Sequence, residues 1–174
     1  MMTRILIALV FCFSLAGVYA QQAMKLYEVV PDSAEKKYLV GFVSKGQITS
    51  DPDFGWYPQN LKYSKPNKDY VELIKPRAYD FQVMLFLGTW CHDSQQILPK
   101  YLALLEAAEF PDHRMMLIAC DRQKAAPANL HRPLNVTNVP TLIVLKDGRE
   151  VGRIVEYGES GMVDKELAEI IGKM

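Results

Sequence analysis

Residues 83–94 read VMLFLGTWCHDS, a nearly unbroken apolar run that passes directly into small and polar residues. The run at 83–87 is typical of a strand that is buried on both faces of an α/β sheet. Over residues 95–110, apolar side chains then recur at helical spacing, at Ile97, Tyr101, Leu104, Leu105 and Ala108. The segment therefore predicts that Cys91 lies on the turn between a buried strand and a helix.

Further elements are predicted on both sides of this unit. Residues 38–48 favour a strand or a hairpin, and residues 49–64 an irregular packed loop. A short helix is expected to open near Pro66 and to run to about Lys75, where Pro76 stops it. The remaining chain predicts strands over 115–119, 141–145 and 150–155, a ragged helical piece over 130–134 and a final helix over 163–174. This order predicts an α/β fold.

The composition excludes several classes of protein. The chain has 174 residues, 49% of them hydrophobic, with 20 Lys and Arg against 20 Asp and Glu, which is ordinary for one soluble globular domain. A net charge of zero provides no basic field for binding nucleic acid. Three cysteines are too few for a disulfide-stapled miniprotein. His113 and His131 show no metal-ligand spacing to His92, so we predict neither a metal nor a cofactor.

Residues 1–20 have the three-part pattern of an export signal. Arg4 supplies the positive charge, residues 5–15 the apolar stretch, and Val18-Tyr19-Ala20 a small-x-small cleavage site. The alternative is an uncleaved N-terminal anchor, although the apolar stretch is short for a membrane span. We expect a signal peptide at 1–20 and a single domain at 21–174. The protein would then be periplasmic or secreted, without stable membrane insertion after cleavage.

The position of Cys91 at the start of a helix predicts a reactive thiol. Unpaired backbone N–H groups and the dipole at a helix N-terminus favour a thiolate, which is the nucleophile in disulfide exchange. The alternative for a free cysteine is a small buried hydrophobe. For Cys120, which ends the strand at 115–119, that buried role is the favoured interpretation, and a thiol that attacks an adduct on Cys91 is the alternative.

Five features occur together in the order and spacing of a known superfamily. They are Trp90-Cys91-x-x-Ser94, Pro99, Val139-Pro140-Thr141, Asp147-Gly148 and Gly158. From about Tyr38 to Met174 the chain resembles the thioredoxin superfamily. The resemblance implies a thioredoxin-like fold with a central mixed sheet flanked by helices and an N-terminal extension before it. It also implies a cis bond before Pro140, with Trp90, Val139 and Pro140 contacting the substrate.

The chain departs from the family pattern at two positions. Ser94 replaces the second active-site cysteine, which would otherwise expel the substrate from a mixed disulfide. Its hydroxyl can still donate a hydrogen bond to the Cys91 thiolate. Leu85 replaces the buried acid that many thioredoxins carry. Beside the nucleophile, His92 is predicted to tune the thiolate, and Asp93 either opposes it or serves the helix dipole.

Two functions from different classes follow from these residues. The first is a thiol-disulfide oxidoreductase that forms mixed disulfides between Cys91 and exported proteins or low-molecular-weight thiols. Ser94, His92 and Cys120 would belong to its catalytic site. The alternative is a redox-inactive module that binds peptides or proteins through the loop at Pro140, so the assignment as an enzyme stays open.

Overall fold

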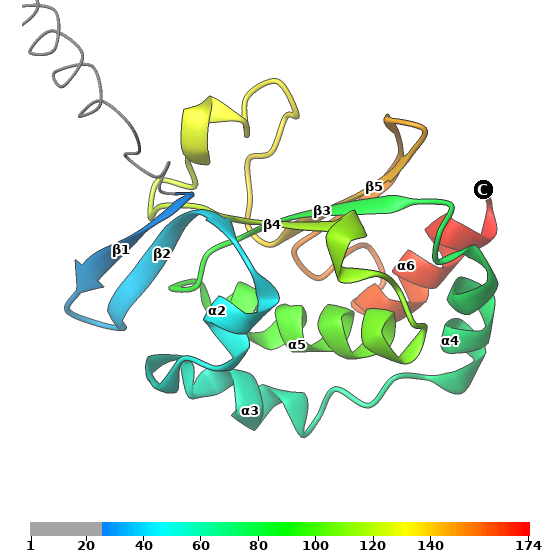
Figure 1. Ribbon diagram of the computed structural model, residues 1–174, viewed down its shortest axis with the longest axis horizontal. Helices are drawn as coiled ribbons and strands as arrows, with labels where there is room; N and C mark the ends of the chain where they lie inside the picture. Colours follow the sequence, from blue (N-terminus) through cyan, green and yellow to red (C-terminus); the bar gives the residue numbers. More distant parts are fainter. Residues whose placement is uncertain (1–25) are drawn as a thin grey trace, which may run out of the picture.

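The computed structural model describes residues 26–174, so the predicted signal peptide lies outside the described part of the chain. Six strands form one mixed sheet in the order β1-β2-β4-β3-β5-β6 (Figure 1). The bounds are Tyr27–Asp32 for β1, Lys36–Val43 for β2, Gln82–Leu87 for β3, Met115–Ala119 for β4, Thr141–Lys146 for β5 and Arg149–Val155 for β6. β3 and β4 are parallel, and the remaining neighbours are antiparallel. The predicted mixed α/β sheet is confirmed.

Helices gather on one face of this sheet (Figure 1). They are α2 at Lys45–Thr49, α3 at Trp56–Leu61, α4 at Lys68–Ile74, α5 at His92–Ala107 and α6 at Val163–Gly172. Short 3₁₀ helices cover Pro52–Phe54, Lys75–Arg77, Asp112–Arg114 and Pro127–Asn129. None of the helices described within residues 26–174 combines the length and apolar character needed to cross a membrane.

The core is divided between the two faces of the sheet. Under the helices, inward side chains of the strands pack against α4, α5 and α6, and Phe81 stacks on Phe110 with ring centroids 4.7 Å apart. On the other face lies the segment that joins β4 to β5 (Figure 1), and its apolar side chains form a smaller cluster with those of the strands. Its buried members are Phe86, Ile118, Cys120, Ala126, Val136, Val139 and Ile143. Cys91 and Trp90 pack against this second cluster, so the predicted site lies at its margin.

The N-terminal half differs from the sequence prediction. A strand over the first part of 38–48 is confirmed, but its hairpin partner is the preceding strand β1, which the sequence did not reveal. Residues 45–49 are helical because Ser44 and Gln47 form a capping box: the Ser44 hydroxyl accepts from the Gln47 N–H, and the Gln47 side chain accepts from the Ser44 N–H. That local signal outweighed the β-branched composition of the stretch.

Three further boundaries are corrected by the structure. The predicted loop at 49–64 contains α3, although its packing role is confirmed by the buried side chains of Phe54 and Tyr57. The next helix, α4, begins only after Asn67, whose side chain accepts from the Asp69 N–H at 2.8 Å. The helical piece predicted at 130–134 is a series of turns instead: Pro133 disfavours the helical conformation at Arg132, and Asn129 and Asn135, on either side of the piece, have positive φ.

Gly41 provides a test of how β2 is held between its neighbours. Its φ of 132° is disallowed for other residues in practice, and an added Cβ would lie 2.4 Å from the Leu26 carbonyl oxygen. We expect Gly41→Ala to lower the free energy of unfolding by about 2 kcal/mol or more. Gly46→Ala is the matched control, because its added Cβ meets nothing within 4 Å. Measured by urea unfolding, Gly46→Ala should have the same free energy of unfolding as the wild type. Equal losses of stability in the two variants would contradict the positive φ and close approach assigned to Gly41.

Candidate functional site

Cys91 lies where the turn after β3 enters α5. It is the N-cap of α5, its own N–H donates to the Gly88 carbonyl at 2.9 Å, and its side chain is partly exposed. The thiol donates to the Val139 carbonyl oxygen at 3.3 Å. The Val139–Pro140 bond is cis, as the resemblance predicts. The structure thus brings the candidate nucleophile, the helix N-terminus and the Pro140 loop together.

Ser94 occupies the first turn of α5 and is almost fully buried, with 1% of its surface exposed. Its hydroxyl oxygen accepts a hydrogen bond from the Gly88 N–H at 3.1 Å. The expected donation to Cys91 is therefore not the contact seen in this state, in which the Cys91 hydrogen points to Val139. Ser94 instead ties the start of the helix to the turn that carries the thiol.

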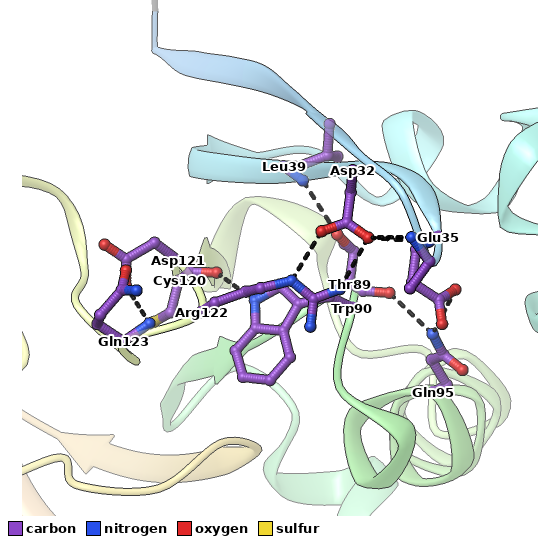
Figure 2. Close-up of polar contacts among 11 residues, drawn as sticks. Asp32, Glu35, Leu39, Thr89, Trp90, Gln95, Cys120, Asp121, Arg122 and Gln123 are labelled. Carbon is purple, nitrogen blue, oxygen red and sulfur yellow. Dashed lines mark hydrogen bonds and ion pairs between the residues drawn. The ribbon is translucent and has the colours of Figure 1, made fainter.

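Trp90 is fixed on several sides beside Cys91. Its indole N–H donates to the Cys120 carbonyl at 3.0 Å, and the guanidinium of Arg122 lies 5.4 Å from its ring centroid (Figure 2). A Cβ added at Gly88 would come within 2.8 Å of the ring, so the turn must carry glycine where the indole folds back over it.

Cys120 belongs to the core in the described structure. It is completely buried, its N–H donates to the Leu87 carbonyl at 2.8 Å, and its thiol faces the Ile118 carbonyl at 3.9 Å. Burial raises the pKa of the Cys120 thiol to about 12, and the nearby Asp121 adds to the effect. The β3–β4 pairing does bring the strand end before Cys120 beside the strand end before Cys91. The resolving role of Cys120 nevertheless stays a prediction, since attack requires an ionised, accessible thiol.

Tyr157, which the sequence did not single out, contacts Asp93 in the first turn of α5. The Tyr157 hydroxyl donates to the Asp93 carboxylate at 3.0 Å, and burial, followed by this hydrogen bond, raises the pKa of Tyr157. The loop carrying Tyr157 is organised by Glu166, which accepts from the N–H groups of Glu159 and Ser160. Asp93 thus has a specific partner besides the helix dipole, whereas His92 is exposed.

Arg122 is the second residue that sequence reasoning missed. Its Nε and one terminal nitrogen contact the two Asp32 oxygens at 2.7 and 2.8 Å, a bidentate geometry. This pairing holds the pKa of Asp32 well below its usual range. Across residues 26–174, no group of three or more histidine, cysteine, aspartate or glutamate side chains is placed to hold a metal ion.

The family model for thioredoxin matches residues 63–169, more than half of the chain. The chain belongs to the thioredoxin family. The match includes β3, α5, β4, β5 and β6, and therefore the whole turn from Gly88 to Ser94. It does not include the hairpin of β1 and β2. The resemblance stated from the sequence is confirmed, and the protein is a thioredoxin-like redox protein at the level of its family.

The chain is also similar to individual thioredoxins. Thioredoxin from Chlamydia pneumoniae is 36% identical over 91 residues, covering 51% of this chain and 76% of that protein. Mitochondrial thioredoxin-3 from Saccharomyces cerevisiae is 30% identical over 87 residues, covering 50% and 62% respectively. Among solved structures, Fasciola hepatica thioredoxin has 27% identity and a TM-score of 0.42, covering 60% of this chain and 90% of that chain.

The buried thiol of Cys120 predicts a pH dependence of stability. In the unfolded chain a free thiol has a pKa of about 8.5, whereas burial raises the pKa of Cys120 to about 12 in the fold. The unfolded state therefore loses a proton that the folded state keeps, so stability falls as pH rises. From about pH 9 to pH 11 the contribution of Cys120 to the free energy of unfolding should fall by up to about 1.4 kcal/mol per pH unit.

Urea unfolding of Cys91→Ser and of Cys91→Ser/Cys120→Ala at pH 8, about 9.5 and about 10.5 isolates this contribution. The single variant should lose stability more steeply with pH than the double variant. Parallel pH dependences would show that Cys120 ionises as readily in the fold as in the unfolded chain.

Proposed function

We propose that the protein is a monothiol thiol-disulfide oxidoreductase that acts through mixed disulfides at Cys91. The observation that supports this most strongly is the partly exposed Cys91 thiol at the N-terminus of α5, facing the Val139 carbonyl beside Pro140. A cysteine retained only for packing would be expected among buried apolar side chains, as Cys120 is. This contrast favours redox chemistry over the redox-inactive binding module.

The first step is an exchange at sulfur. The Cys91 thiol first loses its proton to solvent, after which its sulfur no longer donates to the Val139 carbonyl. The thiolate attacks one sulfur of a substrate disulfide. A Cys91–substrate disulfide forms, the substrate S–S bond breaks, and the electron pair leaves on the second substrate sulfur as a thiolate.

Release of the substrate is the step that Ser94 alters. Its hydroxyl is too weak an acid to provide a competing nucleophile at neutral pH, and it is buried against Gly88. Cys120 is buried in the core and has a raised pKa. The adduct therefore waits for an external thiol. Its thiolate attacks the Cys91 sulfur, so the Cys91–substrate bond breaks, the substrate leaves as a thiolate and Cys91 becomes disulfide-bonded to the external thiol. A second external thiolate then attacks the outer sulfur of this disulfide, which releases Cys91 as a thiolate and the two external thiols as a disulfide.

The substrates that this cycle fits are disulfides of exported proteins and of low-molecular-weight thiols. Val139 and Pro140 would contact the segment beside the reacting sulfur, with Trp90 on one side of Cys91. An exported location follows from the signal pattern at 1–20. In an oxidising compartment substrate disulfides are available.

Alkylation tests whether Cys91 is a reactive nucleophile. Iodoacetamide at neutral pH should modify Cys91 in the folded protein and leave Cys120 unmodified, because the second thiol is buried and protonated. Peptide mapping by mass spectrometry identifies the modified residue, and Cys91→Ser is the control. Absence of modification at Cys91, with full modification after unfolding, would favour the redox-inactive binding module.

A second prediction addresses the blocked release step. Ser94→Cys introduces a resolving thiol with little change in volume, so reduction of insulin disulfides with dithiothreitol as electron source should become faster than in the wild type. Cys91→Ser should remain at background. Leu85, which is buried where many thioredoxins have an acid, should keep the gain incomplete. A wild type that equals Ser94→Cys, and loses activity in Cys120→Ser, would make Cys120 the resolving thiol.

A further inference from the structure

The hairpin of β1 and β2 lies outside the family match but reaches the turn that carries Cys91. The Leu39 N–H donates to the Thr89 hydroxyl at 3.0 Å, inside the core. The Gln95 side chain donates to the Thr89 carbonyl at 3.0 Å and also reaches Glu35, at 3.4 Å. Figure 2 shows these contacts converging on the turn from the hairpin side. The hairpin therefore contacts the active-site turn at Thr89 and the first turn of α5 at Gln95, before and after Trp90 in the chain.

A single carboxylate couples the shape of the hairpin to Arg122. One oxygen of Asp32 accepts the N–H groups of Ala34 and Glu35, each at 2.9 Å, which closes the turn between β1 and β2. Both oxygens of the same group bind the Arg122 guanidinium. The Asp32 side chain is only 11% exposed. The position of the guanidinium is thus set by the closed hairpin turn.

The guanidinium in turn covers the indole. Its central carbon lies 5.4 Å from the Trp90 ring centroid and 5.8 Å from that of Tyr38 on β2, within the range of cation–π attraction. The indole also lies close to Gly88, and its N–H donates to the Cys120 carbonyl. Arg122 follows β4 in the chain, and its contact with the indole is the one that the hairpin holds in place, through Asp32.

We propose that Arg122, held by Asp32, is a positioning residue that fixes Trp90 as a rigid wall beside Cys91, and that the β1–β2 hairpin supports the substrate site through Asp32. This inference rests on the proposed exchange reaction at Cys91. A rigid aromatic wall lowers the entropic cost of seating a peptide beside the reacting sulfur. A small reagent that reaches the sulfur without touching the wall gains nothing from it.

The test compares a peptide with a small reagent at the same thiol. The peptide carries one cysteine blocked as a disulfide with thionitrobenzoate; attack by Cys91 on the peptide sulfur releases thionitrobenzoate, which is followed by its absorbance. Arg122→Met should slow this release by about three- to tenfold, the range that corresponds to loss of a cation–π contact. Alkylation by iodoacetamide should stay within about twofold of the wild type, because the N-terminus of α5 is unchanged. Arg122→Lys should lie between wild type and Arg122→Met.

Fluorescence gives a readout that a purely structural role would not move. The chain has two tryptophans, so in a Trp56→Phe background the signal comes from Trp90. Acrylamide should quench Trp90 more strongly in Arg122→Met than with Arg122 present.

The matched control is Lys37→Met, which removes ion pairs from the same hairpin to Asp51 and Asp53 at 2.8 and 3.0 Å. This variant should leave unchanged both the rate of thionitrobenzoate release from the peptide and the quenching of Trp90 by acrylamide.

Three results would overturn the inference. One is unchanged peptide kinetics and quenching in Arg122→Met. Another is an equal effect of Lys37→Met, which would make the hairpin a general scaffold. The third is an equal slowing of peptide attack and alkylation, which would place the effect on the thiol itself. If wild-type Cys91 reacts with neither reagent, the proposed function fails, and the quenching comparison alone then decides whether Arg122 positions Trp90.

Discussion

The parallel pairing of β3 with β4 is the constraint on which the site depends. Leu87 pairs with Ala119, and the Leu87 carbonyl accepts the Cys120 N–H at 2.8 Å. Because the two strands run in the same direction, both of the segments that follow them leave the sheet at one edge. One segment carries Trp90 and Cys91, and the other carries Cys120 and Arg122. The bond from the Trp90 indole to the Cys120 carbonyl joins them.

This arrangement gives the two described cysteines opposite chemical characters. Cys91 is at a helix N-terminus and partly exposed, whereas Cys120, one residue beyond its strand, is enclosed by apolar side chains. The first thiol is accessible to a reagent, and burial keeps the second protonated by raising its pKa. Together with the buried hydroxyl at position 94, this division supports a cycle in which attack and release use different molecules.

The extent to which the site can be predicted from the sequence depends on how local its signals are. The strand, turn and helix around Cys91 lie within one continuous stretch, and the Val139-Pro140 pair is recognisable by its place before an apolar strand. The capping box at Ser44 and Gln47 is equally local, so it was available in the sequence, although the β-branched composition obscured it.

The contacts that were missed join residues far apart in the chain. Asp32 and Arg122 are 90 positions apart, and Asp93 and Tyr157 are 64 apart. Nothing in the composition near Arg122 indicates that a hairpin carboxylate will hold it over Trp90. Likewise, the burial of Ser94 against Gly88 follows from how tightly the turn folds, which a residue pattern does not specify.

The lifetime of the adduct on wild-type Cys91 tests the central claim most directly. The reduced protein is mixed with the thionitrobenzoate-blocked peptide, excess reagent is removed, and intact mass is followed without any added thiol. The account predicts that the peptide remains disulfide-bonded to Cys91 and leaves only when an external thiol is added. Spontaneous loss of the peptide, with the protein acquiring the mass of an internal Cys91–Cys120 disulfide, would contradict it.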